Sequence, residues 1–311
     1  MQQLPILIGF FLAGTAGTVV LGLVSRWVDR KVTARVQFRQ GPPVLQPLYD
    51  VMKLLGKEVV VPERARGTGF LLAPLLGFAA VSVAAALLWY TAVRPEGVFI
   101  GDLVVVLYIL VLPSLAIILG GAASGSPHAT VGASREMKLM ISYELPLVLA
   151  VVAVLVGTGT HTFRLGDLAA YQSQNGAAAL HWYGAIALVV AFFCMQAKLG
   201  LVPFDIPEAE TELMSGPLVE YSGAPLAVFY LTRAMLLAVM PLFLITVFLG
   251  GIHLAFPGVF LSIVQYVVLL VLIVVVRNTN PRIRIDHAVK FFWYILTPAA
   301  LVSLLLAYAG L

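Results

Sequence analysis

The sequence predicts an all-α, polytopic membrane protein with about eight transmembrane helices. Hydrophobic residues make up 61% of the 311 positions and charged residues only 11%, whereas soluble domains carry about 25% charged residues. The chain also contains eight apolar runs, each long enough to cross a hydrocarbon layer about 30 Å thick. These observations exclude the soluble classes of protein. No internal repeat or low-complexity linker divides the chain, so residues 1–311 are expected to form one integral membrane domain.

The expected spans alternate with more polar connections. The first run lacks the basic n-region and the cleavage site of a signal peptide, so it is retained as the first span. The spans cover residues 3–25, 69–93, 100–121, 140–162, 183–202, 222–249, 255–276 and 290–311.

Basic residues are unevenly divided between the two sets of connections. Sixteen Lys and Arg residues belong to alternate connections counted from the first, and the other set holds only Arg94 and Arg164. By the positive-inside rule, both termini are expected outside the cell. The connections expected to be cytoplasmic are 26–68, 122–139, 203–221 and 277–289.

The first of these connections has an organisation of its own. Polar and apolar residues alternate over 31–39, which predicts an extended segment, and Gly41-Pro42-Pro43 then breaks the chain. After the break an amphipathic helix is expected, lying along the membrane surface or beneath a partner. Its apolar face is Leu45, Leu48, Tyr49, Met52 and Leu55, and its polar face is Gln46, Asp50, Lys53 and Lys57.

Acidic residues are concentrated in the third of these connections. Five of the fifteen acids lie between residues 203 and 223: Asp205, Glu208, Glu210, Glu212 and Glu220. Helix capping is one explanation, since Asp205 precedes Glu208 by three residues and Pro207 suits a first turn. Capping leaves Glu212 and Glu220 unexplained, and a functional loop accounts for all five.

The spacing of these acids permits proton chemistry. If 205–213 is helical, Asp205, Glu208 and Glu212 share one face. Carboxylates that lie close together raise one another's pKa, so that one of them can hold a proton near neutral pH.

Charged residues inside the predicted spans are also candidates, because they are costly in a bilayer. Glu144 is expected about one turn into the fourth span, near Arg135 and Lys138, where it either relays protons or simply forms an interfacial ion pair. Arg233 is expected within the sixth span and requires a carboxylate partner such as Glu220 or Glu144.

The sequence offers few ligands for a cofactor. Cys194 is the only cysteine, the five histidines are dispersed, and no glycine-rich phosphate loop precedes a helix. We therefore expect no cofactor in this chain and expect catalysis to come from partner subunits.

Three segments resemble the H-subunit family of complex I, whose mitochondrial member is NADH dehydrogenase subunit 1. They are Gln46-Pro-Leu-Tyr-Asp50-Val-Met-Lys53-Leu-Leu-Gly-Lys57-Glu58, Ile141-Ser-Tyr-Glu-Leu-Pro146 and Pro203-Phe-Asp-Ile-Pro-Glu-Ala-Glu-Thr-Glu-Leu-Met-Ser-Gly216. The resemblance covers the whole chain and implies eight helices.

In that family the acids form a charged funnel from the redox module toward antiporter-like subunits. The resemblance therefore implies a proton or ion relay made of Glu144, Asp205, Glu208, Glu210, Glu212 and Glu220. It likewise implies that soluble subunits dock on Arg26, Lys31, Arg35, Arg39, Gln46, Asp50 and Lys53.

Two departures from complex I indicate a branch of the family. Arg39-Gln-Gly-Pro-Pro43 runs almost directly into Val44-Leu-Gln-Pro47, and Gly216-Pro-Leu-Val-Glu-Tyr-Ser-Gly223 lacks the usual Asn-Val-Glu-Tyr form. Both resemble the membrane-anchor subunit of group 4, energy-converting nickel–iron hydrogenases. The shortened segment belongs to the region that helps to frame the quinone chamber of complex I.

The hydrogenase resemblance implies a non-catalytic anchor and ion-coupling subunit in a prokaryotic plasma membrane. Its complex would link ferredoxin oxidation to proton or sodium translocation. The implied partners are hydrogenase-like large and small subunits, a ferredoxin-like iron–sulfur subunit and antiporter-like membrane subunits, which would carry the Fe–S clusters and a Ni–Fe centre.

Two alternatives stay open. One is the same subunit in a quinone-reducing, methanophenazine-reducing or sulfur-reducing complex. The other is a stand-alone secondary transporter, against which stand the lack of an inverted repeat and the large charged connections.

Overall fold

The computed structural model describes residues 3–65, 67–94, 102–160 and 162–310, and no strand occurs within them. Residues 100–101 of the predicted third span and residue 311 of the last lie outside the described residues. The helices, in chain order, are α1 (Gln3–Val36), α2 (Gln46–Leu55), α3 (Gly67–Val93), α4 (Asp102–Ile109), α5 (Leu112–Ala123), α6 (Pro127–Thr158), α7 (Leu165–Asn175), η2 (Ala178–Leu180), α8 (Trp182–Lys198), α9 (Glu210–Leu213), η3 (Gly216–Leu218), α10 (Gly223–Phe248), α11 (Gly258–Thr279), α12 (Ile285–Phe291), the π-helical turn η4 (Phe292–Leu296) and α13 (Thr297–Ala309).

The structure contains the spans that the hydropathy pattern predicts. Seven helical stretches among the described residues are long and apolar enough to cross a membrane, and α8, with 17 residues, is a shorter apolar helix. One of the seven combines α4 with α5, and another runs from α12 to α13. The prediction of an all-α polytopic membrane protein with about eight spans is confirmed.

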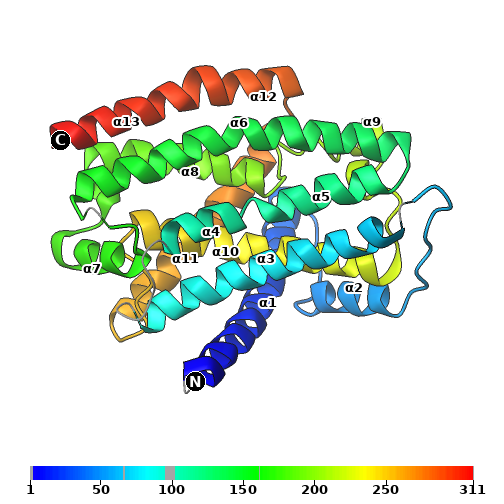
Figure 1. Cartoon of the computed structure of the whole chain (residues 1–311), viewed down its shortest axis with the longest axis horizontal. Helices are drawn as coiled ribbons and strands as arrows, with labels where there is room; N and C mark the ends of the chain where they lie inside the picture. Colours follow the sequence, from blue (N-terminus) through cyan, green and yellow to red (C-terminus); the bar gives the residue numbers. More distant parts are fainter. Residues whose placement is uncertain (1–2, 66, 95–101, 161, 311) are drawn as a thin grey trace.

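Helix α10 occupies the centre of the bundle (Figure 1), where it contacts α1, α3, α8 and α11. Nearly all of its side chains from Ala234 onward are buried, as expected of a helix that is apolar on every side. Helix α1 crosses it closely, since a Cβ atom at Gly22 would collide with the carbonyl oxygen of Ala234. Small residues allow such close backbone approach between membrane helices.

The other helices surround this centre. Helix α6 packs against α5, α8 and α13, and α3 packs against α5. Helix α11 contacts chiefly α1 and α10, and leaves Phe260, Val264 and Val268 exposed. An apolar outer surface of this kind suits contact with lipid or with other membrane subunits.

The connections gather at two ends of the bundle (Figure 1). Helices α2 and α9 lie at one end, to the right in the view, and we call it the α2 end. Helix α7 and the C-terminus lie at the other, which we call the α7 end. Connections 26–68 and 203–221, which were both expected on the cytoplasmic side, come together at the α2 end. The two ends of the bundle therefore agree with the predicted alternation of connections.

Several helix boundaries differ from those predicted, among them the starts of α11, at Gly258 instead of 255, and of α12, at Ile285 instead of 290. Helix α1 continues to Val36 instead of ending at 25, so the predicted extended segment over 31–39 is wrong. Tertiary contacts hold the added turns in place: the Trp27 indole donates to the carbonyl of Pro42 at 3.1 Å, and Arg30 binds Asp50. Helix α6 begins at Pro127 instead of 140, and α8 ends at Lys198 instead of 202.

Helix α2 is the predicted amphipathic helix, and it lies at the surface. Pro47 and Val51 are buried in the contact with α10 and α1, whereas Leu48, Met52 and Leu55 remain exposed. The helix therefore presents an uncovered apolar face at the end where the soluble subunits are expected.

Candidate functional site

The acidic segment 203–223 is mostly irregular. Only α9 and the 3₁₀ turn η3 are helical within it, so the predicted shared helical face of Asp205, Glu208 and Glu212 does not exist. The segment folds back on itself at Gly216, whose φ is 54°. A Cβ atom there would collide with the carbonyl oxygen of Pro207, so the fold requires glycine at this position.

Instead of clustering, three of the acids bind three arginines from different parts of the chain. Asp205 accepts two hydrogen bonds from Arg282, of 2.7 Å from Nε and 2.5 Å from Nη2. Such a bidentate contact fixes both the distance and the orientation of the guanidinium relative to the carboxylate. Arg135 on α6 donates to Glu212 at 2.7 Å. Hydrogen bonding to this arginine lowers the pKa of Glu212, so this acid is ionised at neutral pH.

The third pair lies deeper in the molecule. Glu208 forms an ion pair with Arg233, which α10 places within its spanning segment. Neither of the partners expected for Arg233, Glu220 and Glu144, binds it among the described contacts. The pairing removes the high cost of an isolated guanidinium at membrane depth.

The remaining two acids of the segment take no described part in this network. Glu220 is half-buried, and no ion pair involving it occurs within the described residues. Glu210 begins α9, and the position of its side chain lies outside what the structure describes.

Glu144 also has a partner that the sequence did not indicate. Lys198, at the end of α8, donates to its carboxylate at 3.1 Å and is only 5% exposed. Of the two expected partners, Arg135 binds Glu212 and Lys138 lies exposed on the surface of α6. Glu144 is also deeper than predicted, because α6 starts at Pro127 and places it near the middle of the helix.

Two cavities are both lined by the Glu208–Arg233 pair. The smaller has a volume of about 30 Å³, enough for a water molecule, and is lined by Ser114, Glu136, Lys198, Glu208 and Arg233 among others. The larger, of about 210 Å³, is lined chiefly by charged residues and by the connection after α8. Its charged lining residues are Arg26, Asp205, Glu208, Arg233 and Arg277.

The buried acid Asp29 binds two arginines that line the larger cavity. Asp29 on α1 is 1% exposed and accepts a hydrogen bond of 2.5 Å from Arg277 on α11. Arg26 lies 3.9 Å from the same carboxylate, with its guanidinium over the ring of Tyr230. Polar groups thus extend from the surface pair of Asp205 inward to Glu144.

The predicted docking residues fall into two groups. Arg35, Arg39 and Lys53 are exposed at the α2 end. Arg26 turns inward to the larger cavity, Lys31 is half-buried beside Gly41, and Asp50 binds both Arg30, at 2.7 Å, and Gln46, at 2.9 Å. This second group therefore helps to hold α2 and the connection that precedes it against α1.

Glu136, Asp29 and Lys198 were missed as site residues. The hydropathy pattern places Asp29 and Glu136 in connections, because the last turns of α1 and the first turns of α6 are less apolar than the rest of these helices. A signal for Glu136 was available, since Ser126-Pro127 is a typical start of a helix and moves the beginning of α6 upstream. No sequence signal joins Asp29 to Arg277, which lies 248 residues away.

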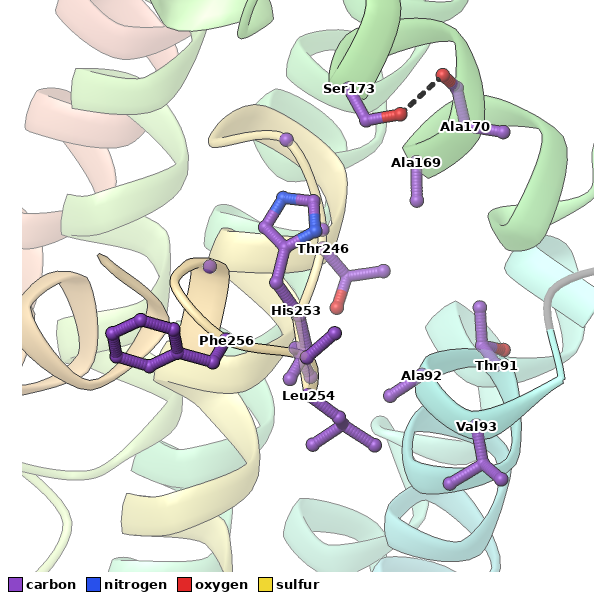
Figure 2. Close-up of a pocket in the computed structure, with 15 residues that line it drawn as sticks. Thr91, Ala92, Val93, Ala169, Ala170, Ser173, Thr246, His253, Leu254 and Phe256 are labelled. Carbon is purple, nitrogen blue, oxygen red and sulfur yellow. Dashed lines mark hydrogen bonds between the residues drawn. The ribbon is translucent and has the colours of Figure 1, made fainter. Parts of the chain in front are cut away.

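A further cavity, of about 790 Å³, is the largest of those described and is lined by residues of α3 and α7 and of the connection after α10, at the α7 end (Figures 1 and 2). Figure 2 shows His253, Leu254 and Phe256 on one side, with Ala169 and Ser173 of α7 and Thr91 to Val93 of α3 around them. No acidic or basic side chain other than His253 is among its described lining residues. It therefore offers no continuation of the charged network.

Comparison with known proteins gives a consistent result over the whole chain. Residues 9–308 match the NADH dehydrogenase family. The chain belongs to that family. Its curated relatives include the NADH-quinone oxidoreductase H subunit of Thermomicrobium roseum, 36% identical over 96% of this chain and 93% of the relative. The H subunit of Geobacillus thermodenitrificans is 35% identical over 93% of this chain and 90% of the relative.

A solved structure is similar as well. It is a chain of the membrane-bound sulfane sulfur reductase, an archaeal respiratory membrane complex, with a TM-score of 0.86 and 27% sequence identity. The match covers 97% of this chain and 99% of the other. This NADH dehydrogenase family member thus has the fold of a membrane subunit from a respiratory complex, and the predicted resemblance to the H-subunit family is confirmed.

Proposed function

We propose that this NADH dehydrogenase family chain is the membrane-anchor and ion-coupling subunit of an energy-converting redox complex. The observation that carries the proposal is the row of paired charges from Asp205–Arg282 through Glu208–Arg233 to Lys198–Glu144, with two cavities beside its middle pair. Half-buried, paired carboxylates next to water-sized spaces are suited to a proton or ion relay. The acids belong to this chain, and we assign the redox centres to its partners.

Within this role we propose a ferredoxin-linked complex of the hydrogenase type. Two features support it over quinone reduction. The shortened connection after Arg39 lies back on α1, where Lys31 donates to Gly41 at 3.5 Å. The cavity beside Glu208 and Arg233 has about 210 Å³ and a charged lining, and a cavity of about 560 Å³ beside Glu212 is lined by four further charged residues, Arg135, Arg282, Arg284 and Asp286. Sites for drug-sized organic ligands, in contrast, are mostly apolar and usually span about 300–1,000 Å³.

A sulfur-reducing complex is the second candidate. Its support is the likeness to the sulfane sulfur reductase chain over nearly the full length of both proteins. In that case the proposed role of this subunit is the same, and only the electron acceptor in the partner subunits differs.

The deciding experiment compares electron transfer with ion movement in the assembled complex. Glu144→Gln and Glu208→Gln keep the size of the side chain and its hydrogen-bonding capacity but remove the charge. In vesicles, we expect the ratio of ions moved to electrons transferred to fall at least several-fold, while the complex stays assembled. Glu63→Gln, at an exposed position of the same end, is the matched control. An unchanged ratio in both test variants would assign these carboxylates to structure alone.

The acceptor is tested separately with the purified wild-type complex. Hydrogen evolution from reduced ferredoxin supports the hydrogenase type. Turnover only with a sulfane sulfur compound supports the second candidate, and a strict need for quinone contradicts both.

A further inference from the structure

Glu136 lies between the two innermost ion pairs without a cation of its own. It is 6% exposed and lines the smaller cavity together with Glu208, Arg233 and Lys198. Within the described residues it forms no ion pair, and its hydrogen-bonding neighbour is the Ser114 hydroxyl on α5. That hydroxyl in turn lies 3.1 Å from the hydroxyl of Tyr143.

Glu136 is the acid of this cavity that has no cation of its own among the described residues. Lys198 is bound to Glu144, which lies outside the cavity lining, and Arg233 is bound to Glu208. A buried carboxylate without a cation is expensive, so the protonated form of Glu136 is favoured.

The other charged groups nearby do not line this cavity. Arg135 and Glu212 neutralise each other at the surface. Arg26 and Arg277 share Asp29 and so leave one positive charge beside the larger cavity, which both arginines line.

We propose that Glu136 is a proton-storing site and that Arg233 controls it by exchanging between Glu208 and Glu136. The proposal rests on the ion-coupling function proposed above and assigns a residue and a switch to it. A proton that reaches Glu208 neutralises that carboxylate and releases Arg233. The guanidinium then pairs with Glu136, which gives up one proton to the cavity. One proton enters and one leaves, so the net charge of the cavity does not change.

The stored proton has a direct spectroscopic signature. A protonated carboxylic acid has a carbonyl stretching band that a carboxylate lacks and that shifts in heavy water. In infrared spectra of the solubilised, fully assembled complex at neutral pH, we expect one such band to be present in the wild type and absent in Glu136→Gln. Glu63→Gln removes an exposed, ionised acid and is expected to leave the band unchanged. A band that persists in Glu136→Gln would place the proton elsewhere and overturn the proposal.

The exchange of Arg233 is tested by a variant that keeps Glu136. In Glu208→Gln, Arg233 has lost its carboxylate partner, so it is free to bind Glu136 and the acid ionises. We therefore expect the same band to disappear although Glu136 is still present. This result cannot arise from misfolding around a substituted Glu136, and co-purification of the partner subunits verifies assembly. Persistence of the band in Glu208→Gln would overturn the exchange.

These spectra do not depend on ion transport, so the two proposals can fail separately. If the bands behave as expected while the ion-to-electron ratios of Glu144→Gln and Glu208→Gln equal that of the wild type, the ion-coupling function is refuted. If those ratios fall but the band persists in Glu136→Gln, the proton-storing site is refuted.

Discussion

Arg277 on α11 and Asp29 on α1 form a hydrogen-bonded ion pair of 2.5 Å between segments 248 residues apart. The carboxylate is buried, whereas about a third of the arginine side chain is exposed. Helix α11 has few other contacts with the bundle beyond α1 and α10. The pair therefore fixes this largely exposed helix at the level of the charged cavities.

Removing the acid of this pair is expected to cost more than removing the arginine. Asp29→Ala leaves both Arg26 and Arg277 without an anion, whereas in Arg277→Ala the carboxylate keeps Arg26 at 3.9 Å. We expect a loss of about 3 kcal/mol for Asp29→Ala, as for breaking a buried ion pair, and a clearly smaller loss for Arg277→Ala. Thermal stability of the solubilised complex measures both. Equal losses would show that Arg26 does not compensate.

The contact of α2 with α1 should depend on the charge of Asp50. Burial opposes ionisation of Asp50, but hydrogen bonds from Arg30 and Gln46 outweigh it, and its pKa is lowered. The stabilising contribution is therefore complete above the unfolded pKa of about 3.9 and is lost as the pH falls through the lower folded value. At neutral pH, Asp50→Asn should speed hydrogen exchange of the α2 amides.

A charge swap provides the control for this pair. Arg30→Asp combined with Asp50→Arg should restore part of the protection that each single change removes. Exchange of the α2 amides that is unaffected by Asp50→Asn would mean that Pro47 and Val51 alone hold the helix.

Docking of soluble subunits is expected to need the exposed basic residues of the α2 end. Arg35→Glu and Arg39→Glu reverse charge at exposed positions and should release those subunits at moderate salt, because salt screens the remaining attraction. Arg164→Glu makes the same change at the α7 end and should release nothing. Co-purification against increasing salt measures the effect. Retention of all subunits in both α2-end variants would exclude this surface as the docking platform.

Orientation in the membrane is testable with single cysteines. The native Cys194 is buried, so it contributes little background to labelling by impermeant reagents. The basic connections predict that Glu63→Cys reacts from the cytoplasmic side and Gln174→Cys from outside, both at exposed positions. Cytoplasmic labelling of position 174 would reverse the predicted orientation of the termini.

The positions of the spans could be predicted from the sequence, but several of their ends could not. Apolar runs identify segments that must avoid water, and they do so here even for α8. The charged turns at the end of α1 and at the start of α6 continue as helix because distant partners neutralise or bury Asp29, Arg30 and Glu136. Hydropathy contains no information about those partners.

Only part of the candidate site could be predicted, for the same reason. The motif at 203–216 indicated which acids are candidates. Their ion-pair partners could not be predicted, because an irregular segment has no periodicity that would indicate which residues it contacts. Arg282 and Arg135 reach Asp205 and Glu212 across 77 residues in each case. Such contacts depend on the packing of whole helices, and they replaced the predicted shared helical face with three separate ion pairs.

The burial of α10 on all sides has a consequence for biogenesis. The helix carries Arg233, and a central arginine opposes membrane insertion by about 2.5–3.5 kcal/mol on translocon scales. Its mean hydropathy of 2.1 is high enough for the segment to enter the bilayer alone, with the arginine exposed to lipid or reaching toward the headgroups. Glu208 precedes it in the chain, so the neutralising partner is already synthesised when α10 inserts. Lipid must then leave all faces of α10 as α1, α3, α8 and α11 close around it, which makes its enclosure a late event in the maturation of the subunit.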